Sequence, residues 1–207
     1  MSRPAKSAIK LRAWEEMLVL TDAEVLQIFR DTGALLDGHF LLRSGLHSRQ
    51  YFQCALVLQH PGIAERLCEA LAMKLKGADA EAVISAAMGG LFIGHEVARA
   101  LDVRHIFVEK NAAGKLELRR SFVVAARERF IVVEDVITKG GRVQETMNIV
   151  RERGGEVVAV GALVDRSDGK VNFGVRLESL LRLQIETLDP AACPLCKAGA
   201  AVVKPGS

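Results

Sequence analysis

A buried strand, a pair of acids and a glycine-rich turn follow one another in the segment Phe130–Arg142, FIVVEDVITKGGR. The apolar run ends in Glu134 and Asp135, and the chain then turns through Gly140 and Gly141 into a predicted helix. A helix N-terminus offers unpaired backbone N–H groups and the positive end of a dipole, and glycines let the backbone come close to a phosphate. The segment therefore predicts an anion site.

The two acids stand at the carboxyl end of this strand, where open α/β sheets bind their ligands. Carboxylates placed there can accept hydrogen bonds from sugar hydroxyls. A plainer interpretation is that Asp135 or Thr138 caps the helix and that the glycines only make a tight turn. Two adjacent acids directly after a fully apolar strand are rarer than such a turn, but on the residues alone both interpretations stay open.

This segment and five others resemble a known family. VVEDVITKGG is similar to the phosphoribosyl pyrophosphate (PRPP) signature of type I phosphoribosyltransferases. Segments similar to bacterial orotate phosphoribosyltransferases are GHFLLRSGLHSRQYFQC (38–54), AMGG (87–90), LRRSF (118–122), VDRSDGK (164–170) and CPLCKAG (193–199). The likeness runs from about Thr21 to the C-terminus, and the chain is identified on it as a member of the bacterial orotate phosphoribosyltransferase branch.

The resemblance implies roles for the glycine-rich segment. Glu134 and Asp135 would hold the ribose 2- and 3-hydroxyls, with Asp135 also among the catalytic candidates. The PRPP 5-phosphate would be wrapped by the backbone of Val136, Ile137, Thr138, Lys139, Gly140, Gly141 and Arg142. Thr138 and Arg166 would contact orotate, and a planar guanidinium at a strand end can grip a carboxylate with two hydrogen bonds. Arg166 could instead be a surface arginine paired with Asp165 or Asp168.

Two further parts of the site follow from the same resemblance. Met88, Gly89 and Gly90 look like the family's pyrophosphate loop, in which small residues admit the diphosphate to the backbone; an ordinary strand-to-helix turn is the alternative. Arg43 stands where the family has a lysine near the substrate, and it keeps the charge with a different hydrogen-bond geometry. Tyr51 and Phe52 could stack on the pyrimidine or belong to the core.

The polar stretch Lys110–Lys115 resembles the family's catalytic loop, which closes over the site of the neighbouring subunit of a homodimer. Such a loop would exclude water from a short-lived carbocation-like species. Lys115 is the candidate for neutralising the departing pyrophosphate, with Lys110 and Arg119 in support; a solvated surface loop is the alternative.

The chain departs from the family pattern at three points. Lys139 stands where a small or hydroxyl residue is usual, Arg142 stands where a serine or threonine is usual, and no histidine lies between Glu109 and Phe122.

The implied reaction joins orotate N1 to C1 of PRPP, and it gives orotidine 5-phosphate and pyrophosphate in pyrimidine (UMP) biosynthesis. Mg²⁺ would be held mainly by substrate oxygens and water, with no protein metal ligands. The alternatives are a noncatalytic PRPP-binding relative and transfer to another base; VDRSDGK and LRRSF argue against both.

The surrounding pattern indicates how these residues are positioned. Short apolar runs alternate with helical patterns beyond residue 80, which predicts an α/β fold with a mostly parallel central sheet. Strands are expected at 82–87, 105–109, 130–134 and 157–164, and an edge hairpin is expected after 115. Helices are expected from the Thr21–Glu24 capping box to Gly33, from Pro61 to Gly77, and at about 91–101 and 143–153.

Composition and net charge limit the class of protein and its domain organisation. Half of the 207 residues are hydrophobic, but no apolar run approaches the roughly 18 residues of a membrane span, so a soluble protein is expected. A net charge of +3 is too slight to imply nucleic acid. We expect a basic extension over 1–20 and one phosphoribosyltransferase domain over 21–207, whose hood lies mainly at 21–60 with a possible C-terminal contribution.

The four cysteines fit no secreted disulfide framework, which predicts a reducing cytoplasm. Cys54 and Cys68 fall on segments expected to be buried. Cys193 and Cys196 have the spacing of half a zinc site, but the chain offers no second such pair. A closing structural turn is the interpretation favoured for them.

Overall fold

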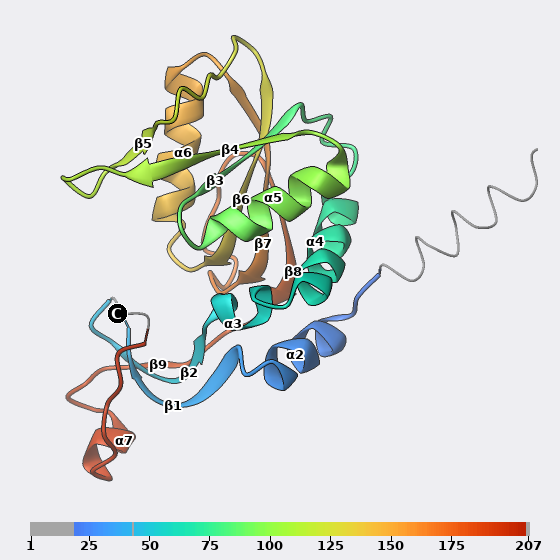
Figure 1. Cartoon of the computed structure of the whole chain (residues 1–207). Helices are drawn as coiled ribbons and strands as arrows, with labels where there is room; N and C mark the ends of the chain where they lie inside the picture. The colour runs from blue at the N-terminus through green and yellow to red at the C-terminus, as the bar shows by residue number, and fades with distance from the viewer. Residues whose placement is uncertain (1–18, 43, 206–207) are drawn as a thin grey trace, which may run out of the picture.

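The computed structural model describes residues 19–42 and 44–205. A six-stranded sheet forms its centre, in the order β5-β4-β3-β6-β7-β8, and a three-stranded sheet, β1-β2-β9, lies beside it (Figure 1). All pairs of the larger sheet are parallel except β4 with β5. The predicted α/β class with a mostly parallel sheet is confirmed. No helix within the described residues is both long and apolar enough to cross a membrane.

The elements follow one another along the chain with short connections. The helices are α2 (Asp22–Asp31), α3 (Cys54–Leu58), α4 (Pro61–Leu75), α5 (Gly90–Leu101), α6 (Gly141–Glu152) and α7 (Pro194–Lys197). The strands are β1 (Leu35–Leu41), β2 (His47–Phe52), β3 (Ala82–Ala86), β4 (Arg104–Lys110), β5 (Leu116–Leu118), β6 (Arg129–Ile137), β7 (Glu156–Asp165), β8 (Arg176–Arg182) and β9 (Thr187–Leu188).

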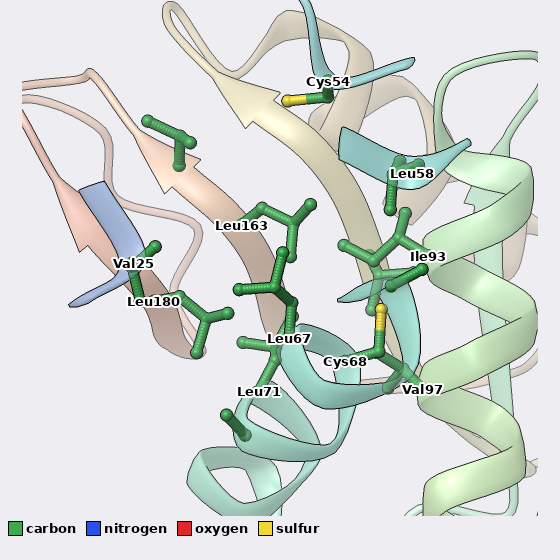
Figure 2. Close-up of a cluster of buried hydrophobic side chains, with 14 of the residues drawn as sticks. Val25, Cys54, Leu58, Leu67, Cys68, Leu71, Ile93, Val97, Leu163 and Leu180 are labelled. Atoms are coloured by element: carbon green, nitrogen blue, oxygen red, sulfur yellow. The ribbon is translucent and has the colours of Figure 1, made fainter. Parts of the chain in front are cut away.

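Successive side chains of the central strands point to opposite faces of the sheet, so the hydrophobic core is divided into two clusters, one on each face. Ile131 and Val133 of β6 belong to the cluster under α4 and α5, whereas Phe130 and Val132 belong to the cluster under α6. Because successive side chains of a strand point to opposite faces, a fully apolar strand such as β6 is the expected pattern for a sheet covered on both sides. Figure 2 shows the first cluster, in which Leu67 of α4 and Ile93 of α5 pack near Leu163 of β7.

The expected helices and strands are confirmed to within a few residues, and the capping box at Thr21 is fully formed. Strand β8 was not predicted, because its sequence RLESLLR carries charges at Arg176, Glu178 and Arg182. Those residues suit the exposed edge of the sheet, where a strand does not need two apolar faces. Cys54 and Cys68 are buried as expected.

The small sheet joins segments from the two ends of the described chain. β1 and β2 form an antiparallel hairpin, and β9 pairs with β2 through His47 and Ser48. Residues near the C-terminus also run beside β1, where Val203 N–H donates to the His39 carbonyl (2.8 Å) and Leu41 N–H donates to the Val203 carbonyl (2.8 Å). In the view of Figure 1, α7 lies on the side of this sheet away from the six-stranded sheet.

Candidate functional site

Two loops meet at the carboxyl ends of β3 and β6. The strands are parallel neighbours, with Ser85 beside Val133, so the Ala87–Gly90 loop and the turn after β6 open on the same edge of the sheet. They approach closely, because a Cβ built on Gly89 would lie 2.9 Å from the Oδ2 atom of Asp135. The structure therefore places the expected pyrophosphate loop directly against the expected ribose-binding acid.

The acid pair is partly withdrawn from solvent. Glu134 is buried and Asp135 is half-buried, and the Oδ1 atom of Asp135 accepts a hydrogen bond from the Val136 N–H (2.8 Å). Burial is the largest effect on Glu134, followed by the neighbouring Asp135 carboxylate, and together they raise the pKa of Glu134 to about 8. The positive charge of Arg142 acts in the opposite direction, which indicates that this side chain lies near the acids. Glu134 therefore keeps its proton to a higher pH than an ordinary glutamate, and in that form it can donate to a sugar oxygen.

The turn after β6 leaves the start of α6 open. Gly140 is the N-cap residue, with φ of +71°, and no side chain caps the helix. The alternative in which Asp135 or Thr138 caps α6 is therefore wrong. Since an α-helix leaves its first N–H groups without intrahelical partners, this end presents free donors and a positive dipole end. Thr138 and Lys139 are exposed beside it.

Gly140 meets two requirements that only glycine satisfies. Its positive φ disfavours other L-residues. In addition, an added Cβ would come within 2.8 Å of Val171 and 2.9 Å of Phe173. The neighbouring Gly141 has nothing within 4 Å of such a Cβ. The segment that follows VDRSDGK thus packs directly on the turn and fixes the position of the open helix end.

The start of α5 is open in the same way. Gly89 is its N-cap residue, and no side-chain cap is present there either. Beneath it, the Ser85 hydroxyl and the His105 Nε2 atom are hydrogen-bonded at 2.8 Å. Burial, with a smaller contribution from His95, lowers the pKa of His105 to about 4, so this support is uncharged near neutral pH. Met88 projects outward with 76% of its surface exposed.

Arg166 lies beyond β7 with an unmet hydrogen-bonding capacity. Its backbone N–H donates to the Ile137 carbonyl (2.8 Å), so it is fixed to the end of β6. Its Nε atom is buried without a hydrogen-bond partner within the described part of the chain, and burial lowers the pKa of the guanidinium. The alternative pairing is wrong, because Asp165 faces Arg182 (3.9 Å) and Asp168 faces Lys170 (3.0 Å).

The residues before α3 approach Arg166 from the small sheet. Tyr51 is half-buried, packs on Phe40 at 5.9 Å between ring centroids, and interacts electrostatically with Arg166. Phe52 is buried and packs edge-on against Phe29 at 5.2 Å, which favours its core role over stacking on a pyrimidine. Arg43 lies outside the described residues.

The β4–β5 hairpin carries the three basic residues of the expected catalytic loop. Asn111 organises its turn, because its N–H donates to the Lys115 carbonyl (2.8 Å) and its side-chain oxygen accepts from the Lys115 N–H (3.0 Å). Lys110, Lys115 and Arg119 are all exposed. Strand β5 is three positions from β6 in the sheet, or about 14 Å at ordinary strand spacing, and Lys110 ends β4, two positions from β6.

A second cluster was missed from the sequence. Cys193 and Cys196 meet His39 and His47, and one nitrogen or sulfur atom of each lies within 4.8 Å of the others. The two histidines are separated from the cysteines by about 150 residues of sequence, and their own spacing fits no metal-binding motif. The only available signal was the C-x-x-C pair itself.

Comparison with known proteins gives a consistent result. No protein-family model matches the chain. It is 54% identical over 184 residues to the orotate phosphoribosyltransferase of Desulforamulus reducens, covering 89% of this chain and 96% of that protein. It is 52% identical over 188 residues to the orotate phosphoribosyltransferase of Pelotomaculum thermopropionicum, covering 91% and 98%. The crystal structure of the Aeropyrum pernix orotate phosphoribosyltransferase matches with a TM-score of 0.65 and 27% identity, over 76% of this chain and 93% of that one.

Proposed function

This chain belongs to the orotate phosphoribosyltransferase family, and from that premise we propose that it transfers the phosphoribosyl group of PRPP to orotate. The products are orotidine 5-phosphate and pyrophosphate, a step of pyrimidine (UMP) biosynthesis. One observation carries the assignment to this site: two uncapped helix starts flank an acid pair, and the half-buried Arg166, whose backbone is bonded to the end of β6, has a buried Nε without a partner. Phosphates, ribose hydroxyls and a planar carboxylate are the groups that these features suit.

PRPP is proposed to lie across the two loops. The open start of α6, from Val136 to Arg142, takes the 5-phosphate, and the Met88–Gly90 loop at the start of α5 takes the pyrophosphate. Glu134 and Asp135 lie between them and hold the ribose 2- and 3-hydroxyls. The close approach of Gly89 to Asp135 supports this placement, because the C1 carbon that carries the pyrophosphate adjoins the ribose hydroxyls.

Orotate is proposed to bind through its carboxylate to Arg166. The unpaired Nε needs an acceptor, since a buried donor without a partner costs about 1–3 kcal/mol. Thr138, directly after β6, and Tyr51, which interacts electrostatically with Arg166, are the other proposed contacts. Arg43 remains a proposed contact from the β1–β2 connection.

The chemistry needs no protein nucleophile. The C1–oxygen bond of PRPP breaks, its electron pair leaves with pyrophosphate, and the N1 lone pair of orotate forms the new bond to C1. Positive charge grows on the ribose ring while negative charge grows on the leaving group. Asp135, adjoining the ring, stabilises the former, and the N–H groups at the start of α5 stabilise part of the latter.

Mg²⁺ is proposed as the cofactor, held through the substrate. Within residues 19–42 and 44–205, no group of three acidic or imidazole side chains gathers at this edge of the sheet, which suits a cation carried mainly by pyrophosphate oxygens and water. Bound there, Mg²⁺ would neutralise charge on the leaving pyrophosphate. The chain's own contribution is to orient that pyrophosphate against the α5 N-terminus.

The catalytic loop is proposed to act on the neighbouring subunit of a homodimer. Lys115, supported by Lys110 and Arg119, lies directly before the edge strand β5, three positions from β6 in the sheet, and this separation supports action on a neighbouring subunit. Met88, in the pyrophosphate loop, and Phe92, in the first turn of α5, are apolar and 76% and 63% exposed, and a second subunit could cover them. Lys115→Ala should lower turnover about 100-fold or more with little change in orotate affinity, because the charge acts mainly in the transition state.

Mixed dimers test this arrangement. Combining Lys115→Ala subunits with Asp135→Asn subunits should restore part of the activity, because one site of each hybrid then has an intact acid and an intact loop. If hybrid dimers of verified composition regain no activity, the loop acts within its own chain.

The domain organisation and location complete the proposal. We propose one phosphoribosyltransferase domain over residues 21–207, with its hood mainly at 21–60 and a C-terminal contribution for which the pairing of β9 with β2 is the support. The extension 1–20 lies almost entirely outside the described residues. The cytoplasm is the proposed location.

The direct test is an assay of base consumption. Orotate, uracil and adenine are each supplied with PRPP and Mg²⁺, and nucleotide and pyrophosphate are measured. Orotate alone should be converted, with equal amounts of the two products. PRPP binding without conversion of any base would indicate a noncatalytic relative, and conversion of adenine in place of orotate would indicate another base.

A further inference from the structure

Four metal-binding side chains converge on the small sheet, outside the site for PRPP and orotate. His39 lies in β1, and His47 is the first residue of β2. Cys193 is the N-cap residue of α7, and Cys196 lies within that helix. We propose that these four side chains hold one Zn²⁺ ion in a tetrahedral Cys₂His₂ site that fastens the C-terminal segment to the β1–β2 hairpin.

The distances fit one ion at the centre of the cluster. The sulfur–nitrogen separations are 3.5 Å for Cys193 Sγ to His39 Nε2, 3.7 Å for Cys196 Sγ to His39 Nε2 and 3.4 Å for Cys196 Sγ to His47 Nδ1. Ordinary Zn–S and Zn–N bonds in a tetrahedron place such atoms about 3.6 Å apart. The two imidazole nitrogens are 2.8 Å apart and would have to separate to about 3.3 Å, a shift of half an ångström.

A hydrogen bond to the backbone sets the ligand atom of His39. Its Nδ1 lies 2.9 Å from the Ala200 carbonyl oxygen, which can only accept, so Nδ1 carries the proton and donates. In the neutral ring Nε2 therefore keeps a lone pair, and this lone pair faces the cluster. Metal-bound histidines commonly donate their outer N–H to a backbone carbonyl in this way.

The donor set selects a borderline-soft ion. Two sulfurs and two imidazole nitrogens suit Zn²⁺ and exclude the oxygen-preferring Mg²⁺ of the transfer reaction. His39, His47 and Cys193 are buried, whereas Cys196 is exposed and leaves a route for the ion to enter. Four protein ligands fill a zinc tetrahedron, so the site is structural and not catalytic.

The local packing explains why the fold would use a metal here. From Asp189 to Pro205, Cys193 is the single buried residue, and α7 is only four residues long. Such a segment buries almost no apolar surface, so hydrophobic packing does little to hold it. A structural zinc contributes its binding free energy to folding, and here it would join residues about 150 positions apart.

The first test measures metal in the untagged, reduced protein. Elemental analysis should find about one zinc per chain, and replacement by Co²⁺ should give the intense thiolate-to-cobalt charge-transfer absorption of a tetrahedral site. Cys196→Ser should weaken Zn²⁺ binding about 100-fold or more, since losing even a hydrogen-bond partner of a ligand costs roughly 10- to 100-fold. Because Cys196 is exposed, this variant is expected to fold.

Matched controls distinguish these ligands from other thiols and imidazoles. Cys68→Ala removes a buried thiol from the main core, and His60→Gln removes an exposed imidazole; both variants should retain zinc at the level of the unmodified chain. His39→Gln and Cys193→Ser should lose it. In the unmodified chain, a strong chelator should lower the Tm and expose the segment after Asp189 to protease, and added Zn²⁺ should reverse both effects.

The proposal is overturned if the reduced protein takes up neither Zn²⁺ nor Co²⁺, or if Cys196→Ser and His39→Gln bind zinc as tightly as the unmodified chain. Metal-free protein with a Cys193–Cys196 disulfide that gains no metal after reduction would equally overturn it and would indicate a redox pair.

Discussion

The start of α2, which its own side chains cap, differs from the glycine starts of α5 and α6; α3, α4 and α7 also lack a side-chain cap, but their N-cap residues are not glycines. At α2, the Thr21 hydroxyl accepts from the Glu24 N–H (3.3 Å), and the Glu24 carboxylate accepts from the Thr21 N–H (2.8 Å). At α5 and α6, the corresponding positions are the glycines Gly89 and Gly140, and no side chain caps either helix. The start of α2 thus satisfies its backbone N–H groups with its own side chains, whereas the starts of α5 and α6 leave theirs available to a ligand.

The acidic residues beside these helix starts differ in their pKa. Hydrogen bonds from Thr21 lower the pKa of the exposed Glu24, whereas burial and the adjacent Asp135 raise the pKa of Glu134 to about 8. Satisfied polar groups at α2 contribute to stability alone. The Nε atom of Arg166, buried without a partner, costs stability in the free protein, and a ligand that supplies its partner recovers that free energy. The uncapped starts of α5 and α6 offer donors to the same ligand.

The largest expected effect concerns the unpaired guanidinium. Arg166→Gln should lower kcat/KM for orotate by about 100-fold or more, because breaking a desolvated charge pair costs about 2–5 kcal/mol. Arg166→Lys keeps the charge without the planar guanidinium, so its kcat/KM for orotate should lie between those of Arg166→Gln and the unmodified enzyme. Steady-state kinetics at saturating PRPP measure both, and an Arg166→Gln enzyme with unchanged orotate kinetics would remove Arg166 from the site.

The two adjacent glycines give the next largest effect. Gly140→Ala should weaken PRPP binding by about 10- to 100-fold, since a left-handed conformation costs a non-glycine residue roughly 1–3 kcal/mol and the new Cβ meets Val171 and Phe173. Gly141→Ala is the matched control and should bind nearly as well, because its Cβ meets nothing within 4 Å. Calorimetric titration compares them, and equal losses would contradict the role of the turn geometry.

The raised pKa of Glu134 predicts a pH dependence. The folded pKa, about 8, exceeds the ordinary value of 4.5, so the contribution of this group to stability is fully present below pH 4.5 and is lost as pH rises towards 8. Glu134→Gln removes the ionisation and should therefore be more stable than the unmodified chain at pH 8.5 and gain much less at pH 5. Urea unfolding of the ligand-free proteins at both pH values measures this difference. A gain of the same size at both would show that ionisation is not the cause.

The smallest effect is expected where the helix start is already satisfied. Thr21→Ala should lower the free energy of unfolding by about 1 kcal/mol, or about 2–4 °C in Tm, through loss of the cap. Neither kcat nor KM should change. A kinetic effect as large as that of Gly140→Ala would mean that the capped start of α2 and the glycine starts do not differ in function.

Contiguous features were predictable from the sequence. The buried strand, the acid pair and the glycine turn lie within 13 consecutive positions, Phe130–Arg142, so local chain geometry alone brings them together. The same holds for the capping box at Thr21 and for the periodic apolar face of α4, whose bounds agree with the prediction.

Features that depend on tertiary contact were not predictable. That Gly140 is closed in by Phe173, that Phe52 packs on Phe29, and that Arg166 has no partner for Nε all depend on contacts between separate segments. The pairing of His39 with Cys193 across the small sheet is of the same kind. No local period or spacing encodes such meetings, because they are set by how the sheets and their connections pack.

The most direct test of this difference between the capped and the glycine helix starts follows individual backbone N–H groups. In ¹H–¹⁵N spectra and amide exchange, saturating PRPP with Mg²⁺ should shift and protect the amides of Arg142 and Val143 at α6 and of Gly90 at α5, slowing exchange by about tenfold or more. The amides of Ala23 and Glu24 at α2 should not change. The account is contradicted if PRPP binds while the α5 and α6 amides stay unperturbed, or if the α2 amides respond to the same extent.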